Sequence, residues 1–128
     1  MTEPQDDTVL RILRRARGLI TEPEHWTKNA FARDAKADVV AVGNEAATCF
    51  CSVGAIERAK MDENEPYSTH LLAFEVAASM APIDWRDVHR GGPLPLSWLM
   101  SYNDDTARKH AEVLEVFDKA IARLESLA

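Results

Sequence analysis

Hydrophobic residues recur at helical spacing in several separate stretches of the chain. Over residues 7–20 apolar side chains return every three or four positions, the period of a helix with one buried face. The members of that stripe are Val9, Ile12, Leu13, Ala16 and Ile20. The last stretch, which runs almost to the C-terminus from a cap at Asp105 or Thr106, has the same period. Both stretches therefore predict amphipathic helices.

The middle of the chain predicts two further helices. Asn44 is a suitable N-cap for a helix that ends near residue 60 or 61, and Tyr67–Met80 forms a second apolar stretch. The first of them is rich in small residues, and Gly54 within it costs about 1 kcal/mol relative to alanine. Close approach of another backbone is the expected reason for that glycine. We therefore expect this helix at the centre of the domain, packed against the last helix.

Shorter elements lie between these four helices. The segment Thr21-Glu22-Pro23-Glu24 predicts a short helix, and the β-branched residues around Val40 favour a short β-strand or hairpin near residues 31–42. Residues 84–90 predict one helical turn, residues 91–96 an extended connection and residues 97–102 a short helix. The whole pattern predicts a mostly α, single-domain bundle of five or six helices over residues 7–128, after a disordered tail at residues 1–6.

Composition narrows the class of protein. The chain has 128 residues, of which 46% are hydrophobic and 28% charged, as in one globular domain. A net charge of −6 disfavours non-specific nucleic-acid binding and suits a basic partner. On a helix the side chains of Cys49 and Cys51 would point about 200° apart and could not bridge, which argues against a disulfide scaffold. With no signal peptide and no apolar membrane span in the sequence, we expect a cytoplasmic protein.

A histidine, His110, stands at the start of the apolar stripe of the last helix. Leu114, Phe117 and Leu124 fall on the same side of a helical projection, so the imidazole is expected to point inward. A buried imidazole needs a hydrogen-bond partner. Two interpretations stay open, a structural histidine tied down in the core and a general base at the edge of a cavity. Arg108 and its neighbouring lysine are then expected in the first turn of that helix, where the positive end of the helix dipole disfavours cations.

Three motifs give the chain a resemblance to a known family. The motifs are W-x-x-x-A-x-A-R-D from Trp26 to Asp34, C-x-x-G-A from Cys51, and N-D-x-x-x-R-x-H-A-x-V-x-x-x-F-D-x-A-I from Asn103. The chain thereby resembles a family of small, uncharacterised bacterial and phage proteins, a domain of unknown function. Tyr102 replaces the family's tryptophan before N-D, and residues 83–96 resemble an insertion. The resemblance implies relatedness and a shared fold, but no reaction.

Function is therefore unknown from the sequence, and two hypotheses of different classes remain. The first is a small acidic interaction or accessory protein, associated with phage or a mobile element, that binds an unidentified protein partner. No cofactor or nucleotide-binding motif is present. The alternative is a thiol-dependent enzyme with Cys51 as nucleophile, His110 as base and Asn103 or Asp104 as the orienting group.

Two further ideas have less support. A metal site that combines His110 and Asp104 with His25 or His70 lacks the tight spacing of metal ligands, so no metal or cofactor is expected. A nucleic-acid site on the arginines of the first helix is opposed by the net charge. If a pocket exists, it should lie where the candidate residues converge. These residues are Trp26, Arg33, Asp34, Cys51, Asn103, Asp104 and His110. Arg108 is a further candidate for binding. The sequence predicts no membrane contact and gives no oligomeric state.

Overall fold

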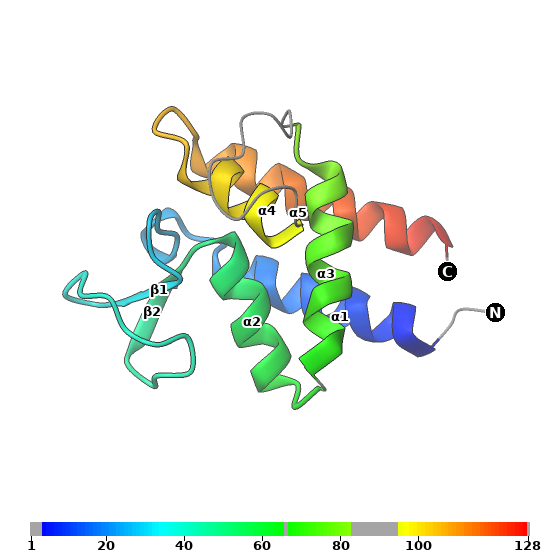
Figure 1. Ribbon diagram of the computed structural model, residues 1–128, viewed down its shortest axis with the longest axis horizontal. Helices are drawn as coiled ribbons and strands as arrows, with labels where there is room; N and C mark the ends of the chain where they lie inside the picture. Colours follow the sequence, from blue (N-terminus) through cyan, green and yellow to red (C-terminus); the bar gives the residue numbers. More distant parts are fainter. Residues whose placement is uncertain (1–3, 66, 83–94, 128) are drawn as a thin grey trace.

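Five α-helices make up most of the described chain, and a small two-stranded sheet projects beside them (Figure 1). The computed structural model describes residues 4–65, 67–82 and 95–127. The helices are α1 (Pro4–Leu19), α2 (Ser52–Asp62), α3 (Tyr67–Met80), α4 (Pro95–Asp104) and α5 (His110–Leu127). The fold is a mostly α single domain, which confirms the class that the hydrophobic period predicts.

Helix α3 contacts all four other helices, and α1 packs against both α2 and α5. In Figure 1 α3 crosses the bundle, with α1 and α5 running beside each other toward the end that holds both termini. The expected packing of the small-residue helix on the last helix is wrong, because α2 and α5 each pack mainly against α1 and α3 instead. The small residue Gly54 of α2 lies against Phe31, in the segment before β1.

The apolar stripes predicted for α1 and α5 form much of the core. The four stripe residues on α1 are buried, as are Ile20 just after it and Val113, Phe117, Ala120 and Leu124 on α5. Burying a side chain such as Phe117 contributes roughly 1.5–3 kcal/mol relative to exposure. Both helices therefore owe their place in the fold to one apolar face, as their sequence period predicts.

The ends of the elements differ from the expected ones by a few residues. Helix α1 begins at Pro4 and α4 at Pro95, because proline is well tolerated in the first turn of a helix. The short helix expected after residue 20 is the 3-10 helix η1 (Pro23–His25). The turn expected at residues 84–90, and the extended connection as far as residue 94, lie outside the described residues.

The sheet corrects the expected start of the central helix. Strand β1 (Ala32–Asp34) pairs antiparallel with β2 (Ala47–Phe50), with Ala32 opposite Phe50. The helix expected from Asn44 thus begins only at Ser52, after a strand. The Asn44 side chain accepts a hydrogen bond from the Ala46 N–H at 2.8 Å in a turn, the alternative use of the same capping chemistry. Strand β1 does lie within the segment expected to be β, but its main partner comes from outside that segment.

Candidate functional site

Residues 26–34, called the strap below, lie against the first turn of α2 and the last turn of α4. The Cys51 N–H donates a hydrogen bond to the Phe31 carbonyl at 3.2 Å, and the Asn29 N–H donates to Asp104 Oδ1 at 3.0 Å. Gly54 makes this approach possible, since a Cβ there would lie 1.9 Å from the Phe31 carbonyl oxygen. The expected close approach of a backbone to Gly54 is confirmed, and the approaching backbone is that of the strap.

Asn103 is the polar centre of this junction. Its side chain is fully buried, and its Oδ1 accepts hydrogen bonds from the Trp26 indole N–H (2.7 Å), the Ser52 N–H (3.0 Å) and the Ser52 hydroxyl (2.8 Å). Its Nδ2 donates to the Thr27 carbonyl and to Asp104 Oδ1, each at 3.0 Å. One amide side chain therefore ties the strap, α2 and α4 together, and it satisfies polar groups that would be costly to bury unpaired.

Asn29 gives the strap the bend that brings it onto α4. Its backbone has a φ of 63°, in the left-handed region that asparagine tolerates better than most residues. Lys28, one residue earlier, donates from Nζ to the Asp105 carbonyl at 2.7 Å and lies over the Trp26 ring at 5.4 Å. The strap is thus fixed at successive residues to the end of α4 and the loop after it.

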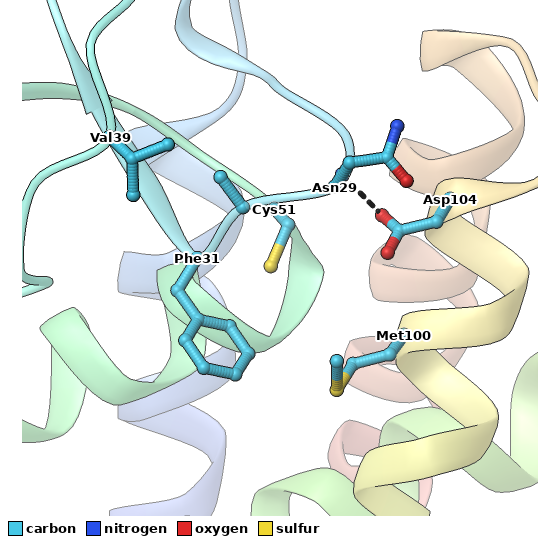
Figure 2. A pocket seen from close by; sticks show the side chains of 7 residues that line it. Asn29, Phe31, Val39, Cys51, Met100 and Asp104 are labelled. Atoms are coloured by element: carbon cyan, nitrogen blue, oxygen red, sulfur yellow. Dashed lines mark hydrogen bonds between the residues drawn. The ribbon is translucent and has the colours of Figure 1, made fainter. Parts of the chain in front are cut away.

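A pocket of about 280 Å³ lies between the strap and α4 (Figure 2). The residues that line it are Asn29, Ala30, Phe31, Val39, Cys51, Met100 and Asp104. Figure 2 shows the Phe31 ring and the Met100 side chain on opposite sides, with the Asp104 carboxylate above Met100. The wall is mainly apolar, and Asp104 is the one charged group among these described residues. Such a combination of apolar wall and few polar groups is typical of ligand sites.

Cys51 lines this pocket but is poorly suited to act as a nucleophile. It is the N-cap of α2, where its Sγ accepts a hydrogen bond from the Gly54 N–H at 3.3 Å. Only 3% of the residue is exposed. Burial raises the pKa of the Cys51 thiol to about 12, more than the Gly54 hydrogen bond lowers it. The thiol is therefore protonated, and hardly nucleophilic, at neutral pH.

The two cysteines should react very differently with iodoacetamide. At about pH 9 roughly one Cys51 thiol in a thousand is ionised, given its raised pKa of about 12. We therefore expect alkylation of the half-exposed Cys49 in the folded protein, and alkylation of Cys51 only after unfolding in urea. Peptide mass spectrometry measures both. A Cys49→Ser variant is the control, and modification of its folded form at Cys51 would contradict this account and favour the thiol-dependent enzyme.

His110 is half-buried, and its Nε2 lies 2.6 Å from the carbonyl oxygen of Ile20. Its ring centroid is 5.6 Å from that of Trp26, on which it packs at a tilt. His110 is not among the residues that line the Cys51 pocket. Its contacts are those of the structural histidine, one of the two interpretations that the sequence leaves open.

The start of α5 explains why cations near His110 are tolerated. The helix begins at His110, later than the cap expected at Asp105 or Thr106, and the Lys109 N–H donates to Glu112 Oε1 at 2.8 Å. This bond lowers the pKa of the Glu112 carboxyl. Arg108 precedes the helix, contrary to the expected place in its first turn. Its guanidinium stacks 3.6 Å above the Tyr102 ring, donates to the Tyr102 carbonyl at 2.9 Å and pairs with Glu112.

Arg33 and Asp34 shape the turn that follows the strap. The Arg33 guanidinium donates to Thr27 Oγ1 at 2.9 Å and to the Ala37 carbonyl at 3.0 Å. Asp34 Oδ1 accepts from the N–H groups of Lys36 and Asp38, at 2.9 and 3.0 Å. The two residues thereby hold residues 34–38 in a tight turn. They lie with Trp26 around a second, open hollow of about 550 Å³, away from Asp104.

The arginines of α1 all form ion pairs within the chain. Arg11 contacts Glu63 and Glu65, Arg14 contacts Glu125, Arg15 contacts Asp62 and Glu63, and Arg17 contacts Asp118. The acidic partners come from the region around the end of α2 and from α5. This face therefore offers a phosphate backbone little net positive charge.

The expected convergence holds for part of the candidate set. Trp26, Asn103 and Asp104 meet in one hydrogen-bonded cluster, and Cys51 shares the pocket wall with Asp104. His110 and Arg108 lie at the adjoining start of α5, while Arg33 and Asp34 turn to the second hollow. Residues whose role rests on long-range contact had no signal in the sequence. They are Ser52, Asn29, Phe31, Val39 and Met100.

These features define a small helical domain in which a strap closes one side of an apolar pocket. The chain belongs to DUF6197, a family of unknown function, whose model matches residues 4–123. This confirms that the chain comes from an uncharacterised family. No curated protein and no solved structure matches the chain. Among the described residues, none of the helices combines the length and the apolar character that crossing a membrane requires.

Proposed function

We propose that the protein is a cytoplasmic accessory protein, of bacterial or phage origin, that binds a partner protein at the mouth of the Cys51 pocket. The observation that carries this proposal is the exposure of two large apolar residues on the pocket wall. Phe31 is 41% exposed and Val39 is 65% exposed. Single exposed apolar residues are ordinary on protein surfaces, but a pair beside a concave apolar pocket resembles the centre of an interface.

The net charge of the protein and the rigidity of the strap also favour partner binding over catalysis. The net charge of −6 favours a basic partner through long-range attraction. The strap that carries Phe31 is fixed by Asn103 and Gly54, so the mouth of the pocket is formed before binding and loses little conformational entropy. A preformed apolar anchor on an acidic protein is therefore the feature that a partner would recognise.

A matched pair of surface substitutions tests this function. Val39→Glu adds a charge at the pocket mouth, and Leu127→Glu adds one at an equally exposed apolar residue (64%) near the C-terminus. In affinity purification from the source organism, wild type and Leu127→Glu should recover one stoichiometric partner. Val39→Glu should recover at least about tenfold less, the loss typical of an interface anchor. Equal recovery with Val39→Glu, or no stoichiometric partner for wild type, would exclude this docking surface.

The thiol-dependent enzyme stays the second candidate because Cys51 does lie on the wall of a ligand-sized pocket. The burial of the thiol and its raised pKa give this candidate less support than docking. His110 bonds the Ile20 carbonyl and would have to leave it to serve as the base. The alkylation experiment above decides between the two candidates, since a nucleophile must ionise in the folded protein.

A further inference from the structure

We propose that the pocket binds a phenylalanine side chain of the partner, carried on a basic segment, with its ring between Phe31 and Met100. This inference rests on the proposed function and names the chemical group that enters the pocket. Three observations point to the ring. They are the volume of the pocket, the kinds of atom on its wall, and the bonds that already hold its polar groups inside the fold. The net charge of the protein points to the basic segment.

The pocket has room for one aromatic ring and the short stem that brings it in. Its volume of about 280 Å³ lies just below the usual range for small-molecule sites, roughly 300–1,000 Å³. An apolar cavity of about 150 Å³ is enough to bind benzene. The remaining volume, toward the exposed side chains of Phe31 and Val39, fits the methylene group and part of the partner's backbone.

The wall suits an aromatic ring better than a saturated one. Figure 2 shows the Phe31 ring on one side, the Met100 thioether on the other, and the Cys51 sulfur pointing into the space between them. Aromatic rings attract each other in tilted or offset pairs, and sulfur atoms make favourable contacts with ring edges. A saturated ring of the same size would bury a similar area without these contacts. The wall therefore predicts a preference for phenylalanine over cyclohexylalanine.

The carboxylate and the thiol on the pocket wall already have partners in the fold. The Asn29 N–H and the Asn103 side chain both donate to Asp104 Oδ1, which makes this carboxylate part of the strap junction. The Cys51 Sγ accepts a hydrogen bond from the Gly54 N–H. A charged side chain that entered the pocket would lose its hydration and would have to compete for groups that the fold already uses. An uncharged ring makes no such demand.

The charge of the whole protein indicates what should flank the phenylalanine. The net charge is −6, and long-range attraction favours association with a segment of opposite charge. This attraction acts outside the pocket and requires no carboxylate on its wall. Lysine or arginine residues beside the phenylalanine therefore strengthen binding at low salt, and acidic residues weaken it.

Titration with two blocked amino acids tests the ring. N-acetyl-phenylalanine methylamide and its cyclohexylalanine counterpart are added to protein with 13C-labelled methionine methyl groups, and binding is followed by NMR. The phenylalanine probe should bind with a dissociation constant on the order of 1 mM, at least about threefold more tightly than cyclohexylalanine. Its ring current should shift the Met100 methyl signal and leave that of Met61, an exposed methionine outside the set of described pocket residues, in place.

A matched pair of methionine variants tests the contribution of sulfur. Met100→Leu keeps an apolar side chain of similar volume without the sulfur, and should lower the preference for phenylalanine at least about twofold. Met61→Leu makes the same change away from the pocket wall and should leave the preference unchanged. If Met100→Leu does not fold, the wild-type comparison of the two rings decides the assignment.

Two blocked tripeptides test the basic segment. In one the phenylalanine stands between two lysines, and in the other between two glutamates. The lysine peptide should bind at least about threefold more tightly in about 0.05 M salt, because the acidic protein attracts it. In about 0.5 M salt the two affinities should converge, since the charges are screened.

The outcomes separate this inference from the proposed function. Equal or tighter binding of cyclohexylalanine, or no shift of the Met100 methyl signal, would overturn the phenylalanine assignment. Equal affinity of the two tripeptides at low salt would overturn the basic segment. A partner lost with Val39→Glu would still support docking in each of those cases. Conversely, a phenylalanine preference without any effect of Val39→Glu on partner recovery would overturn docking at the pocket mouth, and with it the partner as the source of the ring.

Discussion

Replacement of Asn103 by alanine should destabilise the protein by about 3–5 kcal/mol, the largest effect we expect from a single side chain. The substitution leaves the Trp26 indole N–H and the Ser52 N–H without their acceptor, and the Thr27 carbonyl without its donor. Each buried polar group that loses its partner costs about 1–3 kcal/mol. Urea unfolding measures the change in the free energy of unfolding.

Asn44→Ala is the matched control for this substitution. Asn44 is an exposed asparagine whose side chain accepts one bond, from the Ala46 N–H, so its loss should cost less than about 1 kcal/mol. If Asn103→Ala and Asn44→Ala had similar costs, the buried amide could not be what ties the strap to α2 and α4. A change in the denaturant slope would show that the two-state comparison itself has failed.

Replacement of Gly54 by alanine should destabilise the protein by about 2–4 kcal/mol, although alanine is the better helix former. The new Cβ would stand 1.9 Å from the Phe31 carbonyl oxygen and 2.8 Å from its carbonyl carbon. Both are backbone atoms, so the strap itself has to move, and the Cys51 N–H bond to Phe31 has to lengthen. Thermal and urea unfolding should both show the lower stability of the Gly54→Ala variant.

Gly18 in α1 provides the opposite expectation. Apart from its chain neighbours and the backbone of its own helix, nothing lies within 4 Å of the Cβ that alanine would add there. Gly18→Ala should therefore stabilise the protein by about 0.5–1 kcal/mol, as in an unhindered helix. The sign difference between two glycine-to-alanine substitutions in helices is the diagnostic result. If Gly54→Ala were neutral or stabilising, the strap would not press on α2 as described.

The helices were predictable because local periodicity determines them. Val9, Ile12 and Leu13 on α1, and Phe117 and Leu124 on α5, repeat at helical spacing and are buried. An amphipathic helix carries this information in its own sequence, whichever neighbour it packs against. The helical period does not specify which other helix the apolar face packs against. The expected packing of α2 on α5 was accordingly wrong.

The sheet was harder to predict because its partner strand is remote. Residues 47–50 pair with residues 32–34 across a long loop, and their small and β-branched side chains fit a helix as well as a strand. Asn44 added to the error, because an asparagine side chain can close a turn or cap a helix with the same hydrogen bond. Register with a distant strand cannot be read from such a short segment.

The candidate site was predictable in part. Trp26, Asn103 and Asp104 belong to the motifs that drew attention in the sequence, and they do converge. Ser52 was missed although it accompanies Cys51, because its bond to Asn103 spans 51 residues and follows no spacing rule. Phe31 was missed because an exposed apolar residue has no periodic signature. Its significance depends on the pocket beside it.

The pocket is preformed only if the strap is a fixed part of the fold, and amide hydrogen exchange tests that most directly. The Cys51 N–H bonds the strap at Phe31, and the Thr27 N–H bonds Phe50. Both amides should exchange with a free energy within about 1 kcal/mol of core amides such as that of Phe117, through global unfolding. Exchange of Thr27 and Cys51 at about 3 kcal/mol below the core would mean that the strap opens on its own, and that the pocket is not preformed.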